Sequence, residues 1–274
     1  MNARISTTDT PEQYHAVKAV SNSGIGLLLD CPARFKAWRD GGVEKETESM
    51  LHGNVFHCLS LEPEAFSSRY AKKHHSGTTK GGKAEKEEAE RAGLVQVKID
   101  MYHSASEMAG AVRNHKLIGA LFRQPDAMRE VSIYWLETVS GIIVPCKARI
   151  DWRGMFGKSR VAIDLKSTTD ASPEELKRSI YNYGYHRQGA WYQRALQAAG
   201  IDVDAFVLVA VEKEEPYIVT PTTIAEPAIQ KGTDECNEAL EIYAKCETEN
   251  DWPCYTEEII TLDLPPYAYR STIA

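Results

Sequence analysis

The sequence feature that most constrains the fold is a change of hydrophobic period near residue 130. Before it, apolar residues recur at three- and four-residue steps, which is typical of amphipathic helices. After it, the segments EVSIYWLET, IIVPCKARIDW and RVAIDL alternate between apolar and polar residues, as strands do. The chain must therefore combine a mainly helical first half with a sheet.

Helix and strand patterns continue along the second half of the chain. A helix is predicted over 185–199, ended by Gly200, and AFVLVAV after it is typical of a strand buried on both faces. YIVTPTT is predicted to pair with that strand at a sheet edge, because Pro221 cannot donate a ladder hydrogen bond. A last helix over 226–246 completes an α/β fold with helices on the faces of the sheet.

The first half is predicted to contain several helices and one loop. Residues 77–93 are polar and charge-dense, which favours a mobile loop that runs into a solvated helix. The predicted helices are one that begins near Ser21 or Ser23 and is interrupted at Pro32, one over Leu51–Leu61, and one or two over Met101–Phe122.

The length of 274 residues and the 43% apolar content indicate an ordinary globular chain. We expect a single domain over 1–274 with a mainly helical portion (1–125), a sheet core (126–224) and an acidic C-terminal helix and tail (225–274). The longest apolar run is too short to cross a bilayer, and the N-terminus lacks the pattern of a secretory signal. The expected location is the cytoplasm, without membrane contact.

Charge is distributed unevenly along the chain. The net charge of −7 argues against a nonspecific nucleic-acid coat, whose affinity depends on excess Lys and Arg. However, residues 1–144 are neutral, residues 145–195 carry +5, and residues 196–274 carry −12. We call residues 145–195 the basic island, and we expect it to bind a polyanion such as DNA locally, in a basic channel.

The stretch CKARIDWRGMFGKSRVAIDLKST carries the most chemistry. Strand alternation directs Asp164 and Lys166 to the same side, and pairing through a turn over 153–159 would bring Asp151 close to Asp164. Two carboxylates and an ammonium group suit phosphodiester hydrolysis with Mg²⁺ or Mn²⁺. The alternative is an ordinary ion pair at a strand end, and Asp-x-Lys alone favours that alternative.

The cysteines and the glycines exclude some cofactors. No G-x-x-x-x-G-K-[ST] pattern occurs, so no ATP-driven motor is expected. The cysteines lack the spacing of a zinc or iron–sulfur site, so we expect reduced thiols and no iron–sulfur cluster. The six cysteines are Cys31, Cys58, Cys146, Cys236, Cys246 and Cys254.

Further motifs complete a recognisable set. They are Gly53-x-x-x-His57, Arg149-Ile150-Asp151, Asp164-Leu165-Lys166 and Gln188-x-x-x-Tyr192, in this order. With ISTTD, SNSGIGLLLDCPARF, MLHGNVFHCLSLEP and EVSIYW, the chain resembles the PD-(D/E)XK nuclease superfamily. Within it, the chain is similar to the RecB-like group and to the nuclease domains of RecE-type exonucleases (exodeoxyribonuclease VIII). The resemblance implies a nuclease core with a mixed central sheet.

The resemblance also implies a metal site. His57, Asp151 and Asp164 would ligate the metal, with the Leu165 carbonyl as a further ligand. Glu130 stands where relatives bring an acidic residue toward the metals, although a glutamate at a strand start is an equal alternative. The metal would be Mg²⁺, for which Mn²⁺ can substitute.

The remaining site residues implied by the resemblance act on the substrate. Lys166 would be the catalytic lysine, and Gln188 and Tyr192 would hold the DNA strand or orient the site. The candidate DNA-binding residues are Arg149, Arg187, Gln188, Tyr192, Lys80 and Lys83.

The implied activity is that of a Mg²⁺-dependent exodeoxyribonuclease on linear double-stranded DNA. It would degrade one strand from 5′ to 3′ and leave 3′ single-stranded tails for a single-strand annealing recombinase. Such enzymes form homo-oligomeric rings around DNA ends. Three alternatives remain: a structure-selective endonuclease or single-strand exonuclease of the same fold, an inactive DNA-end-binding scaffold, and an enzyme of small phosphorylated or carboxylated metabolites.

Overall fold

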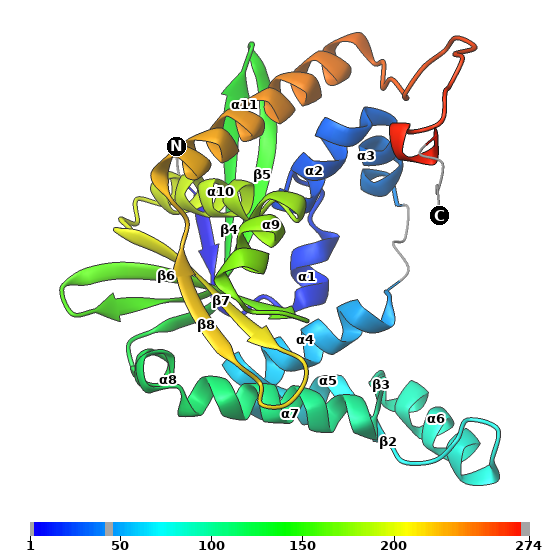
Figure 1. Cartoon of the computed structure of the whole chain (residues 1–274), viewed down its shortest axis with the longest axis vertical. Helices are drawn as coiled ribbons and strands as arrows, with labels where there is room; N and C mark the ends of the chain where they lie inside the picture. Colours follow the sequence, from blue (N-terminus) through cyan, green and yellow to red (C-terminus); the bar gives the residue numbers. More distant parts are fainter. Residues whose placement is uncertain (1–2, 42–45, 270–274) are drawn as a thin grey trace.

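A six-stranded sheet forms the centre of the molecule (Figure 1). The computed structural model describes residues 3–41 and 46–269. The strand order is β1-β4-β5-β6-β7-β8, with β6 and β7 parallel and the other neighbours antiparallel, and β2 and β3 form a separate parallel pair. The strands are β1 (Arg4–Ser6), β2 (Tyr70–Lys73), β3 (Val95–Lys98), β4 (Met128–Val139), β5 (Ile142–Phe156), β6 (Ser159–Thr168), β7 (Ala205–Glu212) and β8 (Val219–Thr223).

Helices cover both faces of the sheet, as expected for an α/β fold. The α-helices are α1 (Pro11–Ala16), α2 (Asn22–Asp30), α3 (Pro32–Arg39), α4 (Glu48–Leu61), α5 (Phe66–Arg69), α6 (Lys80–Ala92), α7 (Ile99–Asn114), α8 (Lys116–Phe122), α9 (Pro173–Asn182), α10 (Tyr185–Ala198) and α11 (Glu226–Glu249). Figure 1 shows α10 and α11 on one side of the sheet and α4, α7 and α8 on the other. Each side has its own apolar core.

The two cores lie on opposite faces of the sheet, and alternate residues of β6 and β7 contribute to each of them. Ile133 and Ile150 face α2, α10 and α11, and they belong to a cluster that includes Trp191. Ile163 and Leu165 face the opposite layer, where they join a cluster from α4, α7 and α8. The period-two pattern of the sequence therefore corresponds to a sheet that is buried on both faces in its centre.

The predicted strands are confirmed, but the hairpin between β5 and β6 is longer than expected. Strand β5 continues beyond Asp151 to Phe156, so the turn is only Gly157-Lys158 and not the whole of 153–159. Gly157 has a φ of +60°, which a glycine adopts without strain. Edge strand β8 pairs with β7, and Pro221 lies opposite Val209 as predicted for an edge.

The first half contains three short strands that the sequence pattern did not reveal. Strands of three or four residues are too short to show alternation. Strand β1 extends the main sheet beside β4. The segment after it is fastened by the buried Lys147, whose Nζ donates to the carbonyl oxygens of Tyr14, His15 and Val17. The N-terminal segment is therefore an integral part of the sheet core.

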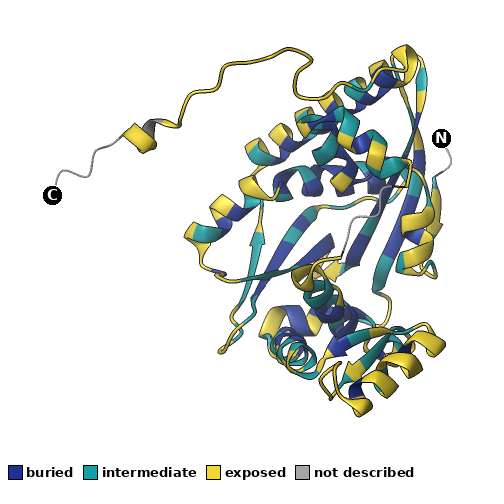
Figure 2. Ribbon diagram, turned by 90° about the vertical axis from the view of Figure 1, so that its right-hand side faces the viewer, coloured by how far each residue is buried: buried dark blue, intermediate teal, exposed yellow. Residues whose placement is uncertain are grey.

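The chain leaves the body after α11. Trp252 stacks on Phe35 with 5.8 Å between the ring centroids, and the Tyr255 hydroxyl donates to Asp30. Beyond these anchors, residues 256–264 extend away from the body, and we call them the C-terminal arm (Figure 2). Among the described helices, none combines the length and the apolar content that a bilayer crossing needs.

We predict that the crossing of α10 and α11 depends on Gly232. A Cβ atom there would lie 2.5 Å from the His186 carbonyl oxygen, so Gly232→Ala must push the helices apart. We expect a loss of about 1–3 kcal/mol in the free energy of unfolding, measured in urea. Gly110→Ala in α7 is the control, because its Cβ would meet its nearest atom only at 3.9 Å. Equal stabilities of the two variants would contradict the close crossing.

Candidate metal centre and active site

Three neighbouring strands carry one acidic residue each at the same level of the sheet. Glu130 in β4 lies between the paired residues Arg129 and Val131, whose partners flank Asp151 in β5. In the next pair of strands, Trp152 of β5 is paired with Ile163 of β6. Asp151 precedes Trp152 and Asp164 follows Ile163, so these two acids are at the same level as well. Antiparallel register therefore puts the three acids in one row, as the pairing of β5 with β6 predicted for Asp151 and Asp164.

Strands β5 and β6 part at this row. Their ladder ends at Trp152 and Ile163, and the next amide to point across, that of Leu165, donates to Oδ2 of Asp151 at 2.8 Å. A side-chain carboxylate thus replaces a backbone carbonyl as acceptor. The parting frees the end of the sheet for side-chain chemistry while the buried amide keeps a partner.

His57 in α4 faces this opening. Its Nε2 lies 2.9 Å from the carbonyl oxygen of Leu165, and its Nδ1 lies 3.4 Å from Oδ2 of Asp151. Since a carbonyl can only accept, Nε2 is the donor in this bond. Three predicted ligands therefore contact one another, and a cation bound by His57 and Leu165 would take the place of the Nε2 proton.

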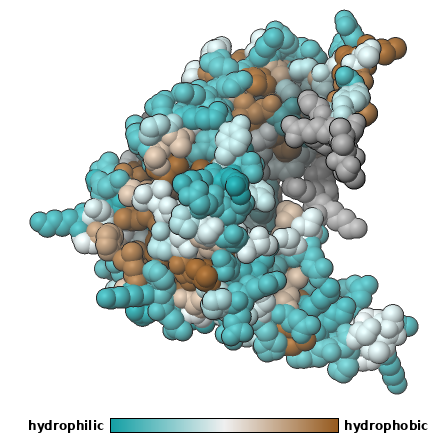
Figure 3. Space-filling view, in the orientation of Figure 1, coloured by the Kyte–Doolittle hydropathy of each residue, from teal (hydrophilic) through white to brown (hydrophobic). Residues whose placement is uncertain are grey.

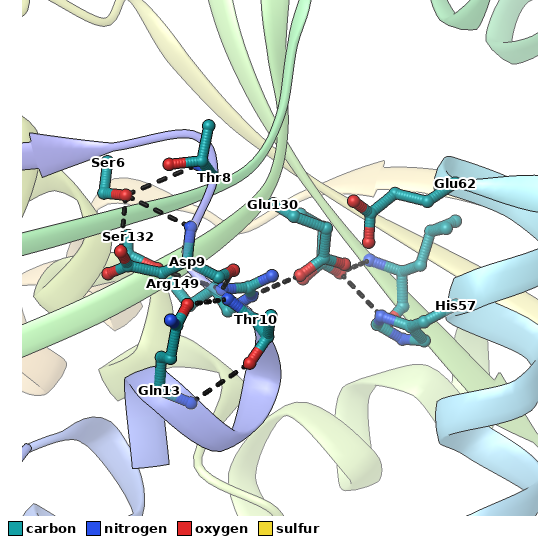
Figure 4. Close-up of polar contacts among 12 residues, drawn as sticks. Ser6, Thr8, Asp9, Thr10, Gln13, His57, Glu62, Glu130, Ser132 and Arg149 are labelled. Carbon is teal, nitrogen blue, oxygen red and sulfur yellow. Dashed lines mark hydrogen bonds and ion pairs between the residues drawn. The ribbon is translucent and has the colours of Figure 1, made fainter. Parts of the chain in front are cut away.

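Glu130 is held toward the same place by a chain of polar contacts (Figure 4). Its backbone has a φ of +50°, an uncommon conformation for a residue other than glycine. Its carboxylate accepts a hydrogen bond from Nε of Arg149. Arg149 in turn donates to the Asp9 carbonyl at 2.9 Å and to Ser132 at 3.0 Å. The N-terminal segment therefore fixes the arginine that holds Glu130.

These side chains form a compact group of potential metal ligands. One ligand atom each from His57, Glu130 and Asp151 lies within 4.8 Å of the other two. Burial raises the pKa of Asp151 to about 7, and the negative charges of Asp164 and Glu130 raise it as well, whereas His57 opposes this. The site therefore concentrates negative charge that a cation would neutralise.

Asp164 lies outside that compact group and has different partners. Its Oδ1 accepts a hydrogen bond from Nε2 of Gln188 at 2.7 Å, and its Oδ2 lies 2.7 Å from Nζ of Lys166. Burial lowers the pKa of Lys166, but the carboxylates of Asp164 and Asp151 outweigh this effect, so the net shift is upward. Lys166 therefore carries a positive charge beside the acids.

Gln188 and Tyr192 lie behind Asp164, on the inner face of α10. Both residues are buried, and Nε2 of Gln188 also lies 2.8 Å from the Tyr192 hydroxyl. Burial raises the pKa of that hydroxyl well above its usual value, so it stays neutral. Of the two roles that the resemblance implies, this geometry favours the orientation of Asp164 over direct contact with DNA.

The other candidate DNA-binding residues lie apart from one another. Arg149 is committed to Glu130, and Arg187 is paired with Glu235. Lys80 and Lys83 are exposed on α6, which packs on the small sheet of β2 and β3. Their contact with DNA stays a prediction.

Most cations of the basic island are paired within the fold, so its net charge of +5 overstates the charge open to DNA. The pairs are Arg149 with Glu130, Arg160 with Asp202 and Asp204, Lys166 with Asp164, Lys177 with Glu174, Arg178 with Glu175, Arg187 with Glu235, and Arg194 with Glu137.

The structure places two further residues near the candidate site that the sequence analysis did not name. Glu62, at the end of α4, lies on the His57 side of the site in Figure 4 and pairs with Arg69 at 2.8 Å. Tyr185 begins α10, and its ring centroid lies 5.3 Å from Nζ of Lys166. The alternate tyrosines of IYNYGYH were a signal for the second residue, whereas nothing in the sequence marked Glu62.

Comparison with known proteins agrees with this architecture. The family model described as "PDDEXK-like domain of unknown function (DUF3799)" matches residues 21–265. No curated protein matches the chain in sequence.

Two solved structures are similar in fold to different degrees. A protein of Eubacterium rectale, described provisionally as an exonuclease, superposes with a TM-score of 0.62 over 97% of this chain and 99% of its own, at 14% identity. At this identity the similarity shows a shared fold. The protein SSO0001 has a TM-score of 0.38 over 82% of this chain and 76% of its own, at 11% identity. This similarity is too low to show a shared fold.

We predict that Asp151 destabilises the metal-free fold as the pH rises. Its pKa is raised from 3.8 to about 7, so the folded chain binds its proton more tightly than the unfolded chain does. The stability gained by Asp151→Asn relative to wild type should grow between pH 4 and 7, to about 2–4 kcal/mol, and level off above. Urea unfolding in EDTA measures it.

Asp204→Asn is the control for this experiment, because its effect on the free energy of unfolding should have the opposite sign. Arg160 lowers the pKa of Asp204 to about 2, so this carboxylate stabilises the fold at neutral pH and loses that effect in acid. The variant should be less stable than wild type at pH 7 and approach it toward pH 2. A pH-independent difference for Asp151→Asn would contradict a buried, ionisable Asp151.

Proposed function

The chain belongs to the family of PDDEXK-like domains described as DUF3799, and on this premise we propose that it is a divalent-metal-dependent nuclease that hydrolyses DNA. One observation carries the proposal. At the point where β5 and β6 part, three potential metal ligands and a charged lysine meet at one end of the sheet. This combination suits the cleavage of a phosphodiester, whose reaction develops negative charge.

The residues present fit a hard divalent cation. Carboxylate and carbonyl oxygens are the ligands that Mg²⁺ and Mn²⁺ prefer, and a histidine nitrogen is compatible with Mn²⁺. The ligand atoms of His57, Glu130 and Asp151 lie within 4.8 Å of one another, so a small inward movement of these side chains would bring all three to about 2.0–2.2 Å from one ion. We propose Mg²⁺ as the ion, with the Leu165 carbonyl and Asp164 completing the donor set.

The ion would polarise the scissile phosphate and lower the pKa of water. Lys166 is held in its charged form by Asp164 and Asp151, so its ammonium group donates to the phosphate or to the attacking water and does not act as a base. Gln188 keeps the Asp164 carboxylate oriented through Oδ1. Arg149 and the Asp9 carbonyl hold Glu130 in position.

We propose linear double-stranded DNA as the substrate, degraded from 5′ to 3′ to leave 3′ single-stranded tails for a single-strand annealing recombinase. The resemblance of the sequence motifs to RecE-type exonucleases supports this specificity. The Eubacterium rectale protein of the same fold is also described, provisionally, as an exonuclease.

We further propose that the chain forms a homo-oligomeric ring, with the C-terminal arm docked on a second copy. Ile259, Ile260, Leu262 and Leu264 of the arm are exposed. Figure 3 shows hydrophobic surface at the upper right, where the arm lies. Repeated head-to-tail contacts close into a ring when the rotation between neighbouring copies returns to the start, which is the arrangement that we propose. Light scattering should report an oligomer, and a strictly monomeric protein would contradict the ring.

We predict that Asp164→Ala and Lys166→Ala each abolish Mg²⁺-dependent release of nucleotides from linear duplex DNA, with losses of about 10²-fold or more. Duplexes labelled at either 5′ or 3′ ends reveal the polarity. Lys158→Ala is the matched control, because this exposed lysine lies in the turn of the same hairpin. Equal activity of wild type and Lys166→Ala would contradict the assignment.

The same assay separates the alternatives. Cleavage of circular DNA would favour a structure-selective endonuclease, and degradation of single strands alone would favour a single-strand exonuclease. Binding of duplex ends without cleavage in Mg²⁺ or Mn²⁺ would favour an inactive scaffold. The compact ligand group of His57, Glu130 and Asp151 favours the active enzyme.

A further inference from the structure

Three alternate tyrosines lie at the corner between α9 and α10. Tyr181 ends the exposed face of α9, Tyr183 follows the helix, and Tyr185 begins α10. Gly184 makes the corner possible with a φ of +66°, and a Cβ atom there would lie 2.5 Å from Nη2 of Arg187. The backbone therefore presents these aromatic rings from a tightly defined turn.

The corner adjoins the catalytic end of the sheet. The Tyr185 ring centroid lies 5.3 Å from Nζ of Lys166, which itself contacts Asp164. The centroids of Tyr183 and Tyr185 lie 5.7 Å apart, with 31° between their planes. A continuous path thus leads from the proposed catalytic lysine through one ring to the next.

The outermost ring of this path is open to a ligand. Tyr183 is 68% exposed, although a tyrosine ring usually buries much of its apolar surface. Tyr181 is 67% exposed as well, but its ring stacks on His186, with 6.2 Å between the centroids, and not on Tyr185, which leads to Lys166. Tyr183 is therefore the exposed ring that adjoins Tyr185 beside the site.

The surroundings fit a nucleic-acid strand. Lys177 and Arg178 precede Tyr181 by four and three residues on α9, so they share its face of the helix. Both cations are largely exposed, and their partners Glu174 and Glu175 are surface residues, whose ion pairs are weak. Exposed aromatic rings next to such cations are the usual means of binding single-stranded bases without sequence preference.

We propose that Tyr183 and Tyr185 form a stacking platform for the nucleobase next to the scissile phosphate. The inference rests on the proposed nuclease function and deepens it, because it assigns a subsite to an unpaired base. Every base offers a planar face, so the platform would accept any sequence. A base held there would have left its duplex partner, so the terminal base pair would have to open before cleavage.

The test is a binding measurement without turnover. Duplex DNA carries 2-aminopurine in the terminal nucleotide, and its fluorescence is recorded with Ca²⁺ in place of Mg²⁺. Stacking on Tyr183 should quench the probe. Tyr183→Ala should lose the quenching and bind about 5- to 100-fold more weakly, whereas Tyr183→Trp should retain both.

Two controls make the measurement specific. Phe156→Ala removes an exposed aromatic ring at the far end of the β5–β6 hairpin and should change nothing. DNA with an abasic terminal nucleotide should bind wild type and Tyr183→Ala equally, because the base that stacks is missing. A defect of Tyr183→Ala that persists on abasic DNA would overturn the platform.

The possible results distinguish a failure of the stacking platform from a failure of the proposed nuclease function. Normal DNA binding by wild type, with unchanged quenching in Tyr183→Ala, overturns the platform alone. Failure of wild type to bind any DNA end overturns the nuclease proposal and the platform together.

Discussion

The hydrogen bond from the Leu165 amide to the Asp151 carboxylate is the contact on which the site depends. It satisfies a buried donor at the point where β5 and β6 part, so the sheet can open without an unpaired amide. On one side of the opening stand His57 and Asp151, and on the other Asp164 and Lys166 follow the alternation of β6. A continuous ladder would leave no room for a ligand between these strands.

The electrostatics of the site follow from the same geometry. Buried carboxylates are costly unless they are paired, and here Lys166 and Arg149 compensate only part of the negative charge. Burial is the largest cause of the raised pKa of Asp151, and the negative charges of Asp164 and Glu130 add to it. The net charge of the whole chain is therefore a poor guide to DNA binding. It includes acids that a metal ion would neutralise and basic side chains that are already paired within the fold, so it does not describe the local electrostatic field at the site.

The sequence predicted those parts of the site that depend on short-range rules. Alternation placed Asp164 and Lys166 on one side of β6, and a single hairpin brought Asp151 beside them. The positive φ of Glu130 has no signal in the sequence. The link from Arg149 to Asp9 could not be predicted, because Asp9 is brought to the site by a three-residue strand that pairs far along the chain. The roles of His57, Gln188 and Tyr192 came from family resemblance, since their spacing alone is that of ordinary helices.

The central claim is that this opening in the sheet binds a divalent cation. Crystals soaked in Mn²⁺ and measured at the manganese absorption edge test it most directly. We expect anomalous density bounded by His57, Asp151 and Glu130, at coordination distances of about 2.0–2.2 Å. A soaked crystal with intact side chains and no density at that position would contradict it.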